Sequence, residues 1–322
     1  MPAPTNGRAG ERVMVPEGPA AAGVDGGATG SRILVLDGRG REMGRTEGPP
    51  LALGSMEIAE LVRRIEALVR EAGGPVRSLV AALAGAGRME DRRAVEGALR
   101  TAPVAGTVRV VSDVEGAHRD AFGTGPGTLL VAGTGSVVLA RTEPGGSVQI
   151  GGWGPSMGDE GSGLWIALEG LKAAARAHDG RGPETSLLDR LVEVCRVAEP
   201  RTLPGWIRGA ARHEVAALAP MVLQESEAGD RQAQRIRGEA VWALREHLEV
   251  AARIQKEGAG PGVDVPPVAL AGGLLRPAGP LREEVARAAG PAAEPLLARE
   301  VRGERGAARY ALELLSEGGG GS

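Results

Sequence analysis

The stretch that decides the fold is GVDGGATGSRILVL, residues 23–36, in which a glycine-rich turn leads into an aliphatic run. Residues 32–36 are typical of a buried strand, and the DGRG turn at 37–40 is followed by a polar strand that ends near Thr46. Apolar side chains between Ile58 and Val69 then recur at helical spacing. The order strand, turn, strand, strand, helix predicts an α/β unit.

The second half of the chain repeats this order. Its predicted strands are 128–132, 137–141 and 147–150, and the apolar spacing from Leu164 to Leu171 predicts the helix that follows. Each copy opens on a glycine turn. We infer a duplicated α/β unit with a cleft between the two copies.

The remaining segments complete each unit. Short buried strands are predicted at 78–83, 107–112 and 267–271, and helices at about 90–99, 186–257, 281–288 and 303–315. These assignments give a disordered N-terminus at 1–19 and a first domain at 20–118. The last helix (303–316) is a candidate addition to this first domain. A second domain at 119–302 contains the helical insertion (186–257), and 317–322 is a flexible tail.

Composition narrows the class of protein. The chain has 322 residues, of which 42% are hydrophobic, so two packed domains are possible; the formal net charge of −3 does not favour a nucleic-acid surface. Cys195 is the only cysteine, which excludes an intrachain disulfide and fits a reducing cytoplasm. No apolar run is long enough for a membrane span, and no signal segment opens the chain. We expect a cytoplasmic protein without nucleic-acid or membrane partners.

The two glycine turns suit phosphate binding, because glycine lets backbone N–H groups approach an anion closely. The turns also carry hydroxyls, at Thr29 and Ser31 in the first and at Thr134 and Ser136 in the second. A plain β-hairpin turn is an equally open interpretation of each. Neither turn matches the P-loop or the dinucleotide fingerprint.

Asp113 ends a predicted strand, the place where α/β sheets carry ligand-binding groups. A carboxylate there can accept the proton of an attacking hydroxyl. The alternative is that Asp113 caps a helix starting at Val114. Further along, residues 151–163 combine six glycines, Trp153 and the acidic pair Asp159 and Glu160 ahead of a helix. Those carboxylates could accept hydrogen bonds from sugar hydroxyls, and a solvated cap stays open for Glu160.

Together these motifs resemble the BadF/BadG/BcrA/BcrD-type ATPase family, which includes N-acetylglucosamine kinase. The matching segments are the phosphate-1 loop at 23–29, the strand end at Ser112-Asp113 with Gly116-Ala117, the phosphate-2 loop at 133–136, the sugar-kinase segment at 151–162 and the adenosine turn at 271–273. The resemblance implies two actin-like (ribonuclease H-like) domains and an ATP-dependent kinase acting on an amino sugar.

The resemblance also implies roles for individual residues. Asp113 would be the base for the sugar hydroxyl, and Asp25 would help to hold Mg²⁺. ATP would be bound by the following residues: Gly26, Gly27, Thr29, Gly133, Thr134, Gly135, Gly272 and Gly273. The sugar would be bound by Asp113 and Thr134 together with Gly152, Trp153 and Asp159.

Three residues depart from the family pattern. Ala28 replaces a glycine, Gly30 stands where a basic residue is common, and Leu51 occupies the position of a sugar-binding Asn. The last change leaves the identity of the sugar open.

Two other functions stay open. One is an ATPase that activates an electron-transfer partner, although its relatives hold a cluster with cysteines and this chain has only Cys195. The other is a non-enzymatic sugar sensor. The oligomeric state is also open, with a homodimer as one alternative.

Overall fold

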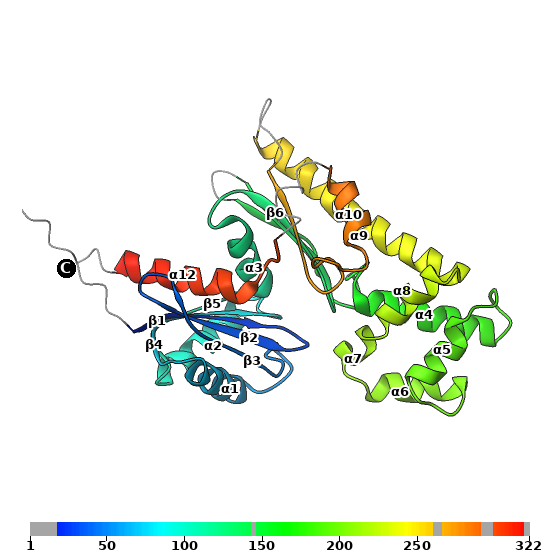
Figure 1. The fold of residues 1–322 in the computed structure, drawn as a ribbon, viewed down its shortest axis with the longest axis horizontal. Coiled ribbons are helices and arrows are strands. Elements are labelled where there is room, and N and C mark those ends of the chain that lie inside the picture. Colours follow the sequence, from blue (N-terminus) through cyan, green and yellow to red (C-terminus); the bar gives the residue numbers. More distant parts are fainter. Residues whose placement is uncertain (1–17, 143–145, 260–265, 291–298, 319–322) are drawn as a thin grey trace, which may run out of the picture.

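The computed structural model describes residues 18–142, 146–259, 266–290 and 299–318. Two mixed β-sheets lie side by side along the molecule, each with its own helices (Figure 1). In the described residues, the first sheet has the strand order β3-β2-β1-β4-β5 and the second has the order β8-β7-β6-β9. The predicted α/β class with two similar halves is therefore confirmed.

The first sheet brings three strand ends to one edge. Its strands are β1 (Pro19–Gly26), β2 (Ser31–Asp37), β3 (Glu42–Gly48), β4 (Val76–Leu83) and β5 (Ala105–Ser112). β1, β4 and β5 are parallel, and their last residues are in register: Gly26 pairs with Leu83, and Leu83 pairs with Ser112. Residues that follow these strands therefore meet at the same edge.

The second sheet repeats this arrangement on a smaller scale. Its strands are β6 (Gly127–Ala132), β7 (Ser136–Arg141), β8 (Ser147–Gly151) and β9 (Val268–Ala271). β9 runs parallel to β6, and Val131 pairs with Ala271 near the end of both strands. The turns after β6 and β9 thus leave the sheet beside each other.

Helices cover both faces of the first sheet. On one face, α1 (Ile58–Glu71) and α2 (Met89–Thr101) bury Leu61, Ile65 and Leu99 against the strands. On the other, α12 (Gly303–Gly318) packs Ala307 and Ala311 against β1 and β4. α3 (Asp113–Phe122) lies beside α12 and connects the two sheets (Figure 1).

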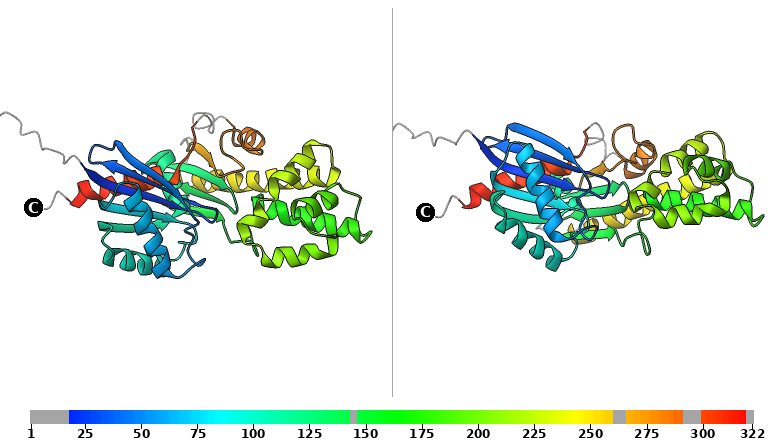
Figure 2. Two further views of the ribbon diagram at one scale, coloured as in Figure 1. Left: turned by 60° about the horizontal axis from the view of Figure 1, so that its bottom comes forward. Right: turned by 90° about the horizontal axis from the view of Figure 1, so that it is seen from below.

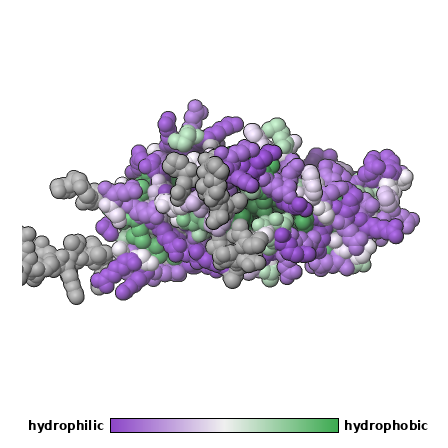
Figure 3. Space-filling model, turned by 90° about the horizontal axis from the view of Figure 1, so that it is seen from above, coloured by the Kyte–Doolittle hydropathy of each residue, from purple (hydrophilic) through white to green (hydrophobic). Residues whose placement is uncertain are grey.

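The rest of the chain is mostly helical and extends the second half. Its helices are α4 (Gly163–His178), α5 (Leu187–Val194), α6 (Leu203–Gly209), α7 (Arg212–Ala216), α8 (Ala219–Glu227), α9 (Arg231–Ala259) and α10 (Arg282–Ala289), with a 3₁₀ turn at Pro200–Thr202. They share one apolar core with the second sheet. Both views in Figure 2 show the predicted insertion projecting away from the first sheet. Apolar residues gather near the middle of the face in Figure 3, and both ends are mainly hydrophilic.

The structure extends or shifts several predicted bounds. β4 begins two residues earlier than predicted, at Val76, and α12 continues to Gly318. Most of the predicted N-terminal disorder (1–17) and most of the predicted tail (319–322) lie outside the described residues. The domain boundaries themselves stay a prediction. Within the described residues, no helix has the length and apolarity needed to cross a bilayer.

Candidate functional site

The first glycine turn is a tight hairpin turn at the end of β1. Gly26 pairs with Ser31 across the hairpin, and the Gly27 amide donates to the Gly30 carbonyl at 2.9 Å. Thr29 is exposed at the tip. The alternative interpretation of this segment as a plain β-hairpin turn is thus correct for its backbone. The hairpin leaves the Thr29 hydroxyl exposed at the edge of the sheet, next to the glycine backbone.

Two neighbouring loops hold this turn in place. The Leu51 amide donates to the Gly27 carbonyl at 3.2 Å, and the Ala84 amide donates to the Gly26 carbonyl at 2.8 Å. Leu51 is fully buried in the apolar core of the first half. Its side chain therefore stabilises the loop, and the position contributes no polar group to a ligand.

Asp25 lies close enough to Asp113 for the Asp113 carboxylate to raise its pKa. Asp25 is the next-to-last residue of β1, and burial raises its pKa to about 7, with further increases from the carboxylates of Asp113 and Glu304. Its carboxyl group also lies against the start of α12, where a Cβ on Gly303 would be 2.8 Å from Asp25 Cγ. The sheet edge thus holds several acidic groups within electrostatic range.

Asp113 is the first residue of α3, directly after β5. Ser112 is the N-cap: its Oγ accepts from the Glu115 amide at 3.3 Å, and the Glu115 carboxylate accepts from the Ser112 amide at 2.8 Å. The interpretation of Asp113 as the cap is therefore wrong. Its Oδ1 accepts from the Val114 amide at 2.9 Å, and burial raises its pKa.

The second half of the site is built around the turn from Gly133 to Ser136. The Gly133 amide donates to the Gly135 carbonyl at 2.9 Å, and the Ser136 hydroxyl donates to the Glu160 carbonyl at 2.7 Å. The Asp159 carboxylate covers the turn, since a Cβ on Gly135 would be 3.1 Å from Asp159 Oδ2. The predicted phosphate-2 loop and the acidic segment after β8 are thus in contact.

Asp159 is held in an unusual backbone conformation. Its φ is +61°, in the left-handed region that residues other than glycine seldom adopt. Burial raises the pKa of its carboxyl group. Backbone strain and a half-buried carboxylate on one residue are features that cluster at functional sites.

The turn after β9 lies beside the phosphate-2 turn. Gly272 has φ +90° and lies so close to Ala132 that a Cβ would be 2.3 Å from the Ala132 carbonyl oxygen, so only glycine fits here. A Cβ on Gly133 would be 3.9 Å from the Gly273 amide nitrogen. The structure therefore brings together the two glycine turns that were predicted to contact ATP in this half.

Gly152 and Trp153 are exposed, and 72% of Trp153 is accessible to solvent. Gly152 follows β8, and the chain then returns to Trp153, where a Cβ on Gly158 would be 3.0 Å from the Trp153 Cβ. An indole exposed to this extent contributes little to the core. It is available to contact a ligand.

The two halves meet at the start of α3. Val114, the neighbour of Asp113, is buried in a cluster with Leu129 of β6 and Ala271, the residue before Gly272. Asp113 is thus attached both to the edge of the first sheet and to the second sheet. The signal for this helix was present in the sequence, because Ser112 and Glu115 form a capping box.

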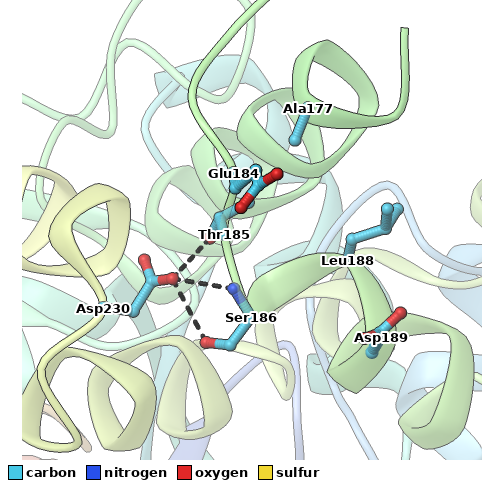
Figure 4. Close-up of a pocket in the computed structure, with 7 residues that line it drawn as sticks. All are labelled: Ala177, Glu184, Thr185, Ser186, Leu188, Asp189 and Asp230. Carbon is cyan, nitrogen blue, oxygen red and sulfur yellow. Dashed lines mark hydrogen bonds between the residues drawn. The ribbon is translucent and has the colours of Figure 1, made fainter. Parts of the chain in front are cut away.

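A pocket lies elsewhere, between α4, α5 and the start of α9 (Figure 4). Three of its lining residues are already bonded to each other: the Asp230 carboxylate accepts from the Thr185 hydroxyl and the Ser186 amide, both at 2.8 Å. The same carboxylate caps α9 through the Ala233 amide. These bonds connect the residues before α5 with the start of α9, within the helical insertion. None of the predicted site residues lines this pocket.

The paired sheets, the strand-end carboxylates and the glycine turns define the actin-like ATPase fold. The chain belongs to the BadF/BadG/BcrA/BcrD ATPase family, whose pattern it matches over residues 22–311. Both predictions from the sequence, of fold and of family, are therefore confirmed.

Individual relatives are sugar kinases. An N-acetylmuramic acid/N-acetylglucosamine kinase of Clostridium acetobutylicum is 29% identical in a 231-residue alignment that covers 69% of this chain and 76% of that protein. An N-acetyl-D-glucosamine kinase of Dictyostelium discoideum is 26% identical, over 69% of this chain and 76% of that protein. The crystal structure of a proposed N-acetylglucosamine kinase from Chromobacterium violaceum superposes with a TM-score of 0.69 at 27% identity, over 93% of this chain and 100% of that one.

Proposed function

We propose that this protein transfers a phosphoryl group from ATP to a hydroxyl of an amino sugar, with Asp113 as the general base. The observation that carries the proposal is that Asp25 and Asp113 lie at the same edge of the first sheet, beside the hairpin turn, where the Asp113 carboxylate raises the pKa of Asp25. The relatives named above act on N-acetylglucosamine or N-acetylmuramic acid, which supports the choice of an amino sugar.

Asp113 is suited to the role of base. It begins a helix at the junction of the two sheets, and its raised pKa gives its carboxylate a greater affinity for a proton than an exposed aspartate has. Accepting the proton of a sugar hydroxyl would make the oxygen a better nucleophile toward the terminal phosphate. One such group typically accelerates a reaction by about 10²- to 10⁴-fold.

A magnesium ion fits the first half of the site. Burial, together with the carboxylates of Asp113 and Glu304, raises the pKa of Asp25 to about 7, and a cation at this point would relieve the repulsion among the three carboxylates. Among the described residues, no cluster of three or more acidic, histidine or cysteine side chains could hold a metal alone. This agrees with the usual coordination of Mg²⁺ by one or two carboxylates, water and the phosphates of the nucleotide. Asp25 would hold the ion, which neutralises charge on the phosphates.

The glycine turns would hold the nucleotide. Gly26, Gly27 and Thr29 would contact its phosphates from the first half, and Gly133, Thr134 and Gly135 from the second. Gly272 and Gly273 would contact the adenosine. Backbone N–H groups and hydroxyls at such turns bind anions without requiring a side-chain charge.

The segment after β8 would bind the sugar. Trp153 offers an exposed ring for the apolar face of a pyranose, and the neighbouring Gly152 is exposed beside it. The half-buried Asp159 carboxylate would accept hydrogen bonds from sugar hydroxyls and, through its contact with Gly135, would link sugar binding to the phosphate-2 turn.

Release of ADP measured across a panel of sugars tests the proposal. The panel contains N-acetylglucosamine, glucosamine, N-acetylmuramic acid and glucose, each with ATP and Mg²⁺. We expect strong stimulation by at least one amino sugar. Equal ADP release without sugar would favour an ATPase, and no ADP release with any sugar would favour a sensor.

A further inference from the structure

Arg32 lies directly across the hairpin from Asp25. β1 and β2 are antiparallel with Asp25 in register with Arg32, and on the other side Arg32 is in register with Glu47 of β3. Side chains of opposed residues in antiparallel strands lie on the same face, with Cβ atoms about 4.5–5.5 Å apart. The guanidinium of Arg32 is therefore on the same face as the Asp25 carboxylate, two residues after the glycine turn.

This part of the site is rich in negative charge. Asp25 and Asp113 approach each other, and Glu304 is fully buried at the start of α12. One oxygen of Glu304 accepts from Arg45 at 2.7 Å, and the other has no hydrogen-bond partner among the described residues. An approaching triphosphate would be repelled here unless cations offset these carboxylates.

The hairpin turn itself carries no basic side chain, because residues 27–30 are Gly, Ala, Thr and Gly. Arg32 is the nearest basic residue after it in the sequence. Its positive charge also reaches Asp25, where it lowers the pKa against the increase caused by burial. The basic residue that follows the turn most closely in the sequence is thus on β2 and outside the turn.

Arg32 is only weakly held where it is. Its ion pair with Glu47 has an N–O distance of 3.4 Å, and the two side chains are 50% and 75% exposed. Exposed pairs of this kind contribute little to stability, because both charges remain solvated and are screened by salt. A phosphate group can therefore compete successfully with Glu47 for the guanidinium, whose planar N–H groups match two phosphate oxygens at once.

We propose that Arg32 exchanges Glu47 for a terminal phosphate group of the nucleotide and is a specific phosphate-binding residue of this chain. The inference rests on the proposed function in that the bound nucleotide is ATP. Arg32 would thus supply the side-chain charge that the hairpin turn lacks.

Calorimetric titration of the full chain with ATP, ADP and adenosine tests this proposal. Arg32→Gln should weaken ATP binding by roughly tenfold or more, as expected for loss of a charge-assisted hydrogen bond. ADP should lose less and adenosine nothing. Arg32→Lys should recover part of the loss. Arg39→Gln, at the exposed turn at the other end of β2, is the matched control and should bind ATP like the wild type.

A second variant separates phosphate binding from a structural role. Glu47→Gln removes the same ion pair but should leave ATP affinity unchanged or tighter. The proposal is overturned if Arg32→Gln binds ATP as tightly as the wild type, if it loses adenosine affinity equally, or if Glu47→Gln reproduces its defect. If no sugar stimulates ADP release although ATP binding depends on Arg32, only the kinase proposal fails. A wild type that does not bind ATP overturns both.

Discussion

Gly306 of α12 lies against the backbone of Gly116 of α3, so closely that a Cβ on Gly306 would be 2.0 Å from the Gly116 carbonyl oxygen. α3 begins at Asp113, and α12 begins at Gly303 beside Asp25. The contact between α3 and α12 therefore fixes the position of the Asp113 carboxylate relative to that of Asp25, although more than 80 residues separate Asp25 from Asp113 in the sequence.

Asp120 strengthens this helix contact, and we expect its removal to destabilise the fold. Its buried carboxylate accepts from the Arg305 guanidinium at 2.5 and 2.6 Å, from Arg299 at 2.8 Å and from the Arg302 amide at 2.9 Å. Asp120→Ala should lower the free energy of unfolding by about 3 kcal/mol, at the low end for a broken buried pair because the arginines stay partly exposed. Urea denaturation measures the change.

The matched control is Glu60→Gln, which breaks exposed pairs within α1. It should change the free energy of unfolding far less than Asp120→Ala does, because exposed ion pairs contribute little. Equal effects of the two substitutions would show that the Asp120 cluster does not hold α3 to α12.

Much of this arrangement could be predicted from local patterns. The glycine turns, the strand runs and the amphipathic helix from Ile58 to Val69 were identifiable because their signals lie within a few residues of each other. The contact of α12 with α3 could not be predicted in this way, since it depends on Gly116 and Gly306, whose role appears only when distant segments pack. The burial of Leu51 and the cross-strand position of Arg32 likewise depend on the three-dimensional arrangement.

Asp113→Asn should abolish most of the proposed kinase activity without unfolding the protein. Asparagine keeps the shape and can still accept a hydrogen bond from the Val114 amide, but it cannot take a proton from a sugar hydroxyl. We expect kcat to fall by about 10²- to 10⁴-fold, with ATP affinity within a few-fold of the wild type. Sugar-dependent ADP release and calorimetry measure the two quantities.

Asp91→Asn, in the first turn of α2, is the control for Asp113→Asn and should retain normal turnover. A kcat close to that of the wild type in Asp113→Asn would show that Asp113 is not the general base.

Gly135→Ala should uncouple sugar binding from the phosphate-2 turn. The new methyl group would be about 3.1 Å from the Asp159 carboxylate, which must then move. Because Asp159 is in a strained conformation, we expect a KM for the sugar raised by roughly tenfold and little change in melting temperature. Gly97→Ala, where the methyl group meets open space in α2, should leave the KM unchanged. If the KM for the sugar is unchanged in Gly135→Ala, Asp159 does not contribute to sugar binding.

His118 should make the protein less stable in acid. It is fully buried in α3, its Nε2 lies 3.1 Å from the Gly127 carbonyl oxygen, and its Nδ1 has no hydrogen-bond partner among the described residues. Burial lowers its pKa from 6.5 to about 4. Between these values the unfolded chain binds a proton that the folded protein does not, so stability decreases as the pH falls from 6.5 toward 4.

The contribution of one such group is at most about 1.4 kcal/mol per pH unit within this window. His118→Gln keeps a donor for the Gly127 carbonyl and removes the titrating group. Its unfolding free energy, measured in urea between pH 4 and 7, should decline less steeply than that of the wild type. Identical slopes would show that His118 does not contribute to acid sensitivity.

Trp153 provides a direct optical test of the sugar site. Trp153 is 72% exposed, and Trp242 of α9, which is 61% exposed, serves as the control. If a pyranose stacks on Trp153, the sugar that gives the strongest ADP release should reduce acrylamide quenching of tryptophan fluorescence. Trp153→Phe should remove this protection and raise the sugar KM by roughly 3- to 10-fold, since a smaller ring stacks less well. Trp242→Phe should retain both properties. Protection that persists in Trp153→Phe and disappears in Trp242→Phe would move the sugar site from the segment after β8 to the surface of α9.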